Sequence, residues 1–331
     1  MAGGPGNRPA RLRHDHDDQT MTTTLEHPPT GPSSPDGRPG PAPAGPRRRA
    51  ARFLARHPRI RLGITLGPPL TWLLVVYIGA LAALLVTSLF SLVDDPTGLL
   101  TRLSTSLSLE NYERLWNTSV YREVAQRTVV AAITVTVIDA LLALPIAFYM
   151  AKVASPWGKR ALVIAVTMPL WAGYLVKGYA WRAILDPGGG VLKEVFGSSP
   201  GFGSTSAIIV LCYLWFPYMV IPLFAGLERL PDSLLEASTD LGAKAGRTFR
   251  SVVMPQLLPA LAAGSIFTFS LTLGDFYMNR IVGGTNEYIG NIVYRNFSAD
   301  LPFSAAYSMV PVVIMVIYLL AIRRTGALEE L

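Results

Sequence analysis

Six long apolar stretches alternate with shorter polar segments along this chain. A membrane-spanning helix needs about 20 consecutive, mostly apolar residues. Stretches of that length predict spans at residues 66–93, 128–151, 161–185, 206–227, 256–274 and 305–322. The pattern therefore predicts an all-α integral membrane protein with six transmembrane helices.

The segment before the first span has a different composition. Residues 1–60 are rich in Pro, Gly, Arg and Thr and lack apolar periodicity. Such a segment cannot bury enough apolar surface to fold, so we predict a disordered tail followed by a six-span domain over residues 61–325. The run from His14 to Asp18 resembles a metal cluster but has no closed ligand set, which favours a solvated run. Met21 is an alternative translation start.

Composition and charge agree with a membrane protein. Of 331 residues, 50% are hydrophobic and only 15% are charged, whereas soluble proteins carry about 25% charged residues. The net charge of +7 lies largely in the tail and in loops on the same predicted side. We therefore expect contact with membrane lipid and none with nucleic acid. Basic residues favour the cytoplasmic side, which places both termini in the cytoplasm of a multi-pass plasma or inner membrane protein.

The longest polar segment between two spans, residues 230–255, predicts two short helices separated by a glycine. Ser233 and Glu236 have the spacing of a capping box at the start of the first helix. Gly242 stands where a helix commonly ends in the left-handed conformation. A second helical pattern covers residues 243–253, just before the next apolar stretch.

This segment resembles the EAA loop of permease subunits in bacterial ATP-binding cassette (ABC) importers. The family pattern is Glu-Ala-Ala, three residues, Gly, nine residues and Ile-x-Leu-Pro. The same spacing occurs here at Glu236, Ala237, Ser238, Gly242, Val252, Val253, Met254 and Pro255. Ser238, Val252 and Met254 depart conservatively from it. The resemblance implies a coupling loop that docks on a cytoplasmic ATPase. Glu236 would either help to fix that docking or cap its own helix.

Other phrases extend the resemblance over the six spans and imply the MetI-like fold of type I importers. Residues 109–112, 169–181, 273–276, 283–284 and 289–291 are similar to phrases of polyamine-type permeases. They resemble most the first permease subunit of spermidine/putrescine importers. The same architecture serves importers of opines, aminoethylphosphonate, thiamine and ferric ion, which remain alternatives.

The energy for transport must come from another polypeptide. The sequence contains no G-x-x-x-x-G-K-[ST] phosphate-binding loop. We therefore predict a transport subunit that is not an enzyme and holds no cofactor. The resemblance implies ATPase subunits that bind ATP, a second permease subunit and an extracytoplasmic solute-binding protein. Whether the second permease is an identical chain stays open.

Five residues are candidates for the solute pathway. Asp139 lies in the middle of a span, where a carboxyl is costly; it would either bind a cationic solute or bind a neighbouring helix. Asp275 and Phe276 stand at the outer end of the fifth span and suit a polyammonium group, although Asp275 could instead be a capping carboxylate. Trp171 and Tyr174 would line the pathway or belong to the interfacial aromatic belt.

Two other classes are disfavoured. A membrane enzyme would need paired catalytic groups, such as a histidine with a carboxylate, but all four histidines lie in the tail. A secondary transporter would show inverted repeats with matching coupling carboxylates. Here only Asp139 lies deep in a span, and no second half repeats the first.

Overall fold

A computed structural model describes residues 58–94, 101–104 and 106–324. The predicted tail up to residue 57, with His14–Asp18 and Met21, lies outside the described residues. The chain divides into two compact units, 1–69 and 70–331, and the buried core lies in the second.

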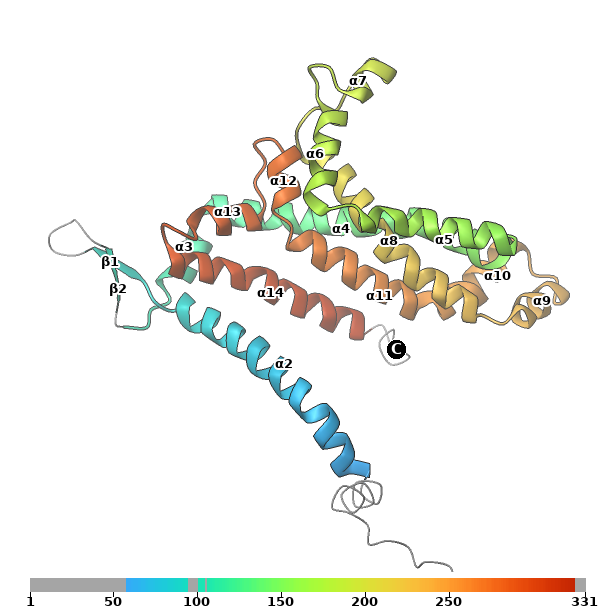
Figure 1. The fold of residues 1–331 in the computed structure, drawn as a ribbon, viewed down its shortest axis with the longest axis horizontal. Coiled ribbons are helices and arrows are strands. Elements are labelled where there is room, and N and C mark those ends of the chain that lie inside the picture. Colours follow the sequence, from blue (N-terminus) through green and yellow to red (C-terminus); the bar gives the residue numbers. More distant parts are fainter. Residues whose placement is uncertain (1–57, 95–100, 105, 325–331) are drawn as a thin grey trace, which may run out of the picture. The chain divides into compact units, whose positions relative to one another are not determined.

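The described residues are mostly helical (Figure 1). Within them, five helices are long and apolar enough to cross a membrane, and a bent helix pair supplies a sixth span. The five are α2 (Pro58–Ser88), α4 (Ser119–Phe148), α8 (Ser204–Arg229), α11 (Met254–Leu273) and α14 (Leu301–Arg323). The predicted all-α architecture with six spans is confirmed.

The third predicted span is broken. Residues 161–185 belong to two helices, α5 (Pro156–Trp171) and α6 (Tyr174–Leu185), which meet at 95°. Ala172 and Gly173 have extended backbones with ψ near 140°, so the helical hydrogen bonds stop there. The carbonyl of Pro169 instead accepts a hydrogen bond from Lys177 Nζ at 3.2 Å. A charged side chain thus satisfies backbone that the break leaves free.

Three helix boundaries differ from the pattern of apolar residues. The first span ends at Ser88, and β1 (Leu92–Asp94) then pairs antiparallel with β2 (Thr101–Leu103). Helix α4 continues into a π-helix, η1 (Tyr149–Val153). The second predicted loop helix is a short α10 (Ala245–Thr248) that runs through the π-helix η2 (Phe249–Val253) into α11.

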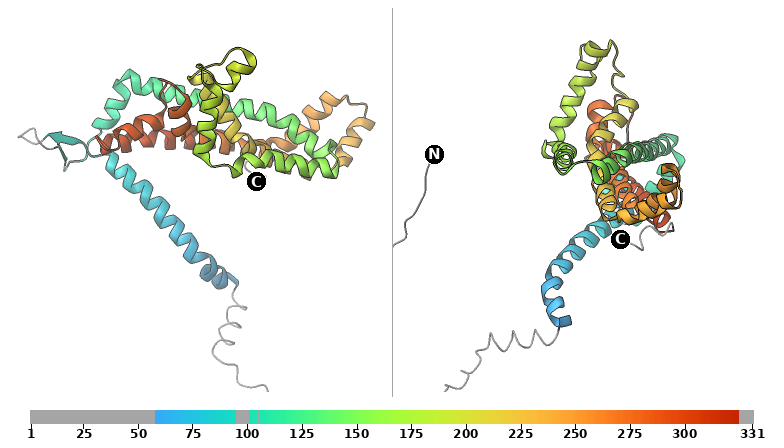
Figure 2. Two further views of the ribbon diagram at one scale, coloured as in Figure 1. Left: turned by 45° about the horizontal axis from the view of Figure 1, so that its top comes forward. Right: turned by 90° about the vertical axis from the view of Figure 1, so that its right-hand side faces the viewer.

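The core lies among α4, α8 and α11, which pack side by side (Figures 1 and 2). Fully buried side chains of α8 such as Leu214, Met219 and Leu223 fill the contact. A Cβ at Gly264 of α11 would lie 2.7 Å from Met219 Sδ, so a larger residue there would require the Met219 side chain to move. These three packed helices run the length of the bundle and hold the shorter elements at its two ends.

The two ends of the bundle carry different elements. Helices α9 (Asp232–Asp240) and α10 lie at one end, and α3 (Glu110–Asn117) and α13 (Ile289–Asn296) lie at the other (Figure 1). Helix α12 (Tyr277–Val282) packs on α6 near α13, and the short α7 (Val191–Phe196) follows α6. Residues 230–255 are therefore separated from α13 by the length of the spans.

Candidate coupling loop and solute pathway

The first helix of the loop starts without the predicted capping box. Helix α9 begins at Asp232, its N-cap is Pro231 with an extended backbone, and no side chain caps it. Ser233 is therefore already inside the helix, and this part of the prediction is wrong. Pro231 has no hydroxyl or carboxylate to accept a hydrogen bond, and with Pro231 as N-cap the helix starts two residues earlier than the capping box predicts. The exposed Glu236 does not cap its helix.

The end of α9 matches the sequence pattern closely. Gly242 has φ +75°, the left-handed conformation that was predicted. Its N–H donates to the Thr239 carbonyl at 2.8 Å, and the Ala243 N–H donates to the Ser238 carbonyl at 3.1 Å. These two bonds form a Schellman motif, which satisfies the last carbonyls of the helix. The reversal leads directly into α10.

The two short helices are also joined by their side chains. Ser238 Oγ and Thr248 Oγ1 lie 2.8 Å apart. The apolar residues here have different surroundings: Leu235 of α9 lies against the core, whereas Leu241, just after the helix, is 89% exposed. Exposed cations follow it at Lys244, Arg247 and Arg250. The loop thus presents an apolar tip next to a basic surface.

A lysine of η1 holds the base of α9. The Lys152 ammonium donates to the Leu230 carbonyl and to Asp232 Oδ1, both at 2.6 Å, and its side chain is only 11% exposed. The second lysine pair nearby, Lys159 with Glu228 at 2.5 Å, is more exposed. The sequence does not predict this contact of Lys152, because its partners lie about 80 residues away and no local pattern connects them.

At the opposite end, the structure brings two predicted pathway residues together. Asp275 is 5% exposed, and its Oδ2 accepts a hydrogen bond from the Tyr174 hydroxyl. Its Oδ1 accepts from the backbone N–H groups of Met278 at 3.0 Å and Asn279 at 3.4 Å. Burial raises the pKa of Asp275 to about 6. The carboxyl caps the start of α12 and ties it to α6 just beyond the break.

The other predicted pathway residues occupy different surroundings. Phe276 is half-buried, and its ring stacks on Tyr294 with 4.9 Å between centroids. Trp171 is 89% exposed at the end of α5. Asp139 is fully buried in α4, and neither carboxylate oxygen has a hydrogen-bond partner within the described part of the chain. Over the same residues, no contact joins Trp171 or Asp139 to Asp275.

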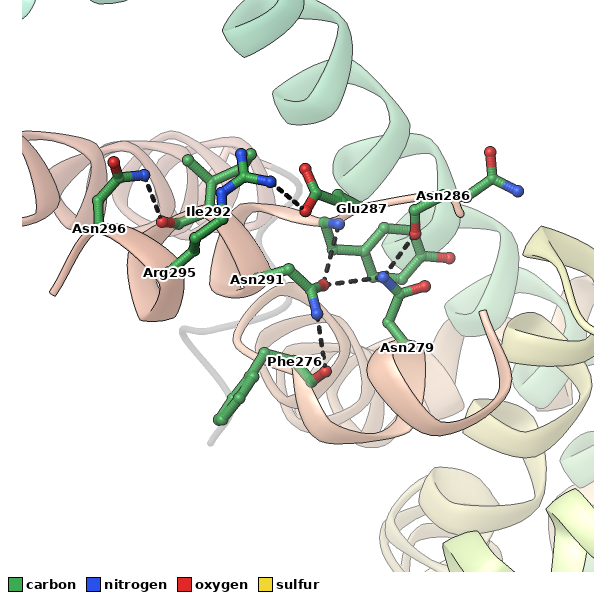
Figure 3. Close-up of polar contacts among 9 residues, drawn as sticks. Phe276, Asn279, Asn286, Glu287, Asn291, Ile292, Arg295 and Asn296 are labelled. Carbon is green, nitrogen blue, oxygen red and sulfur yellow. Dashed lines mark hydrogen bonds and ion pairs between the residues drawn. The ribbon is translucent and has the colours of Figure 1, made fainter. Parts of the chain in front are cut away.

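Two asparagines fasten α12 to α13 (Figure 3). Asn279 Nδ2 donates to Asn291 Oδ1 at 2.8 Å and to the Asn286 carbonyl at 2.6 Å. Asn291 Nδ2 in turn donates to the Phe276 carbonyl at 3.2 Å. Asn279 was not predicted as a site residue, because a single asparagine in a short polar segment has no distinguishing pattern. We refer to Asn279, Asn286 and Asn291 as the asparagine clasp.

Comparison with known proteins places these features in one family. Residues 122–325 match the family described as "Binding-protein-dependent transport system inner membrane component". The chain is 40% identical over 303 residues to the inner membrane ABC transporter permease protein YdcU of Escherichia coli K12, covering 86% of this chain and 95% of that protein. It is 31% identical over 234 residues to the spermidine/putrescine transport system permease protein PotB of the same strain, covering 67% and 83%.

A solved structure supports the fold independently. A chain in the crystal structure of a bacterial alginate ABC transporter, in complex with an alginate pentasaccharide-bound periplasmic protein, superposes with a TM-score of 0.66 at 14% identity. The match covers 84% of this chain and 97% of that chain. The protein therefore belongs to the MetI-like family of ABC transporter permeases, as a multi-pass inner-membrane transport subunit and not an enzyme.

Proposed function

We propose that this chain is the permease subunit of an ATP-driven importer of polyamines, which couples closure of ATPase subunits to alternating access. The observation that carries the coupling role is the loop at residues 230–255, whose Gly242 turn forms with φ +75°. The polyamine assignment is supported by the PotB relatives at about 30% identity. YdcU, at 40% identity, carries no solute in its name.

The ATPase contact lies on the α9–α10 reversal in this proposal. Glu236, Ala237 and Ser238 belong to α9, and Gly242 and Pro255 bound the second segment. The exposed Leu241 offers an apolar anchor, and the cations that follow it suit an acidic groove. Both termini and this loop face the cytoplasm, because loops with an excess of Lys and Arg stay on that side.

The broken third span provides the candidate pathway. Irregular backbone at membrane depth is tolerated only where it is buried in protein or lines a cavity, and discontinuous helices often form solute sites in transporters. Tyr174 follows the break and binds Asp275. A polyammonium solute would replace the Tyr174 hydroxyl on this carboxylate. Phe276 would add cation–π contact.

The remaining two candidates, Asp139 and Trp171, lie away from the Asp275 carboxyl and have other roles in this proposal. Asp139 is sealed inside the bundle in this state, so a solute reaches its carboxyl only when α4 and α8 separate. Trp171 is one of several exposed apolar residues of α5 and α6, which include Ile164, Met168, Leu175, Val176 and Tyr179. Together we refer to them as the α5–α6 face. We assign this face to a second permease subunit. A solute-binding protein is the further partner, on the side away from the coupling loop.

Uptake of labelled spermidine and putrescine by cells with and without this chain tests the solute. We expect uptake to be lost in the deletion strain and restored by the wild-type gene. Unchanged uptake in a strain with no second polyamine importer would contradict the polyamine assignment. The same strains would then be tested for uptake of opines, aminoethylphosphonate, thiamine and ferric ion.

A further inference from the structure

Two adjoining cavities lie where α12 faces α13. One has a volume of about 370 Å³ and is lined by residues of the asparagine clasp together with Arg280, Tyr294 and Arg295. The other, of about 340 Å³, is lined by Tyr179, Arg182, Tyr277, Arg280 and Tyr294, among others. Arg280 and Tyr294 belong to both. The two cavities share these two lining residues, and we refer to the pair of cavities as the Arg280 hollow.

The walls of the Arg280 hollow are held in place by the contacts described above. The asparagine clasp fixes α12 against α13 (Figure 3). Ile289 at the start of α13 donates its N–H to Thr128 Oγ1 of α4 at 3.0 Å. The hollow is thus attached to a long span through the start of α13.

The side chains around the hollow carry an excess of positive charge. Arg295 pairs with Glu287 at 2.7 Å, and Arg182 donates to the Ile281 carbonyl and lies over the Phe202 ring. Arg280 is exposed, lies 5.1 Å over the Tyr294 ring and has no acidic partner among the described residues. Three arginines face one carboxylate around these cavities. The hollow therefore attracts anions and repels cations.

We propose that the Arg280 hollow receives an acidic side chain of the solute-binding protein, whose carboxylate forms a bidentate pair with Arg280. Arginine and tyrosine are the residue types most enriched at the energetic centres of protein interfaces, and the guanidinium fork matches a carboxylate. The inference rests on the proposed function, because a polyammonium solute would be repelled here. The carboxylate must then come from the protein that delivers the solute.

The test uses the complete transporter in lipid nanodiscs, with its ATPases and second permease. ATP hydrolysis is titrated with the solute-loaded binding protein. We expect Arg280→Glu to raise the half-stimulating concentration of binding protein about tenfold or more, because like charges oppose docking. Arg280→Lys should lose less affinity than Arg280→Glu, because it preserves the charge but cannot form the bidentate pair. The wild-type value should also rise with salt, and the Arg280→Glu value should lose this dependence.

Arg122→Glu is the matched control. Arg122 is an exposed arginine near the start of α4 that donates to the Trp116 carbonyl at 2.7 Å, and it is not among the lining residues of the hollow. An equal loss in this control, or a normal half-stimulating concentration in Arg280→Glu, would overturn the proposal. So would a changed KM for solute with unchanged response to the binding protein, which would assign Arg280 to an anionic solute. A wild-type transporter that ignores the binding protein would refute the proposed function itself, and this site with it.

Discussion

Replacing Gly242 with valine should abolish uptake while the chain remains in the membrane. Gly242 adopts φ +75°, a conformation that costs a residue with a Cβ about 1 to 2 kcal/mol and a β-branched residue more. There is open space around the position, since a Cβ added there would have no neighbouring atom within 4 Å. The loss would therefore come from the backbone turn and not from a steric clash. Uptake and membrane abundance are measured together.

Two substitutions separate the turn from other effects. Asparagine tolerates the left-handed conformation better than other residues with a Cβ, so Gly242→Asn should keep substantial uptake. Gly246 is also in open space but lies within α10, so Gly246→Ala should leave uptake unchanged. Normal uptake in Gly242→Val would show that the reversal between α9 and α10 does not depend on this conformation.

Replacing Lys152 with methionine should reduce uptake severalfold. The Lys152 ammonium is nearly buried and holds both the Leu230 carbonyl and Asp232. Methionine keeps much of the apolar stem but leaves the partly buried Leu230 carbonyl without its donor, and an unsatisfied buried polar group costs about 1 to 3 kcal/mol. Asp232, whose side chain is 75% exposed, would instead be solvated by water. The base of α9 would loosen, and motion of the ATPases would be transmitted less completely. The measurement is uptake relative to ATP hydrolysis.

Lys159→Met is the matched control for that prediction. Lys159 pairs with Glu228 near the same loop, but the two side chains are 31% and 42% exposed. Exposed ion pairs contribute about 0 to 1 kcal/mol, so uptake should stay close to the wild-type level. If both variants behave alike, burial of Lys152 is not what makes it important.

The sequence was most informative where a short pattern of residues is compatible with only one local structure. Apolar length located the six spans, and the glycine spacing located the left-handed turn at Gly242. Both depend on neighbouring residues alone. The capping box failed because Ser233 and Glu236 have the right spacing, but the N-cap is Pro231, two residues earlier. Spacing alone does not show which residue begins a helix.

Long-range contacts account for most of what the sequence did not reveal. The partners of Lys152 and the pairing of Tyr174 with Asp275 join residues about 80 and 100 positions apart. The 95° break after Trp171 occurs inside a continuous apolar stretch, so composition does not reveal it. Asn279 acquires its role only because α13 returns to α12. These features depend on how distant segments pack together, and the periodicity of residues along the chain does not predict such contacts.

Photo-cross-linking from the coupling loop tests the central claim most directly. A benzoylphenylalanine is placed at Leu241, which is 89% exposed on the loop, or at Trp116, which is 73% exposed on α3 at the other end. In the purified assembly, the chain captured at each position is identified by mass spectrometry. We predict capture of the ATPase subunit at position 241 and not at position 116. Capture of the ATPase at position 116, with none at 241, would contradict the assignment of residues 230–255 as the coupling loop.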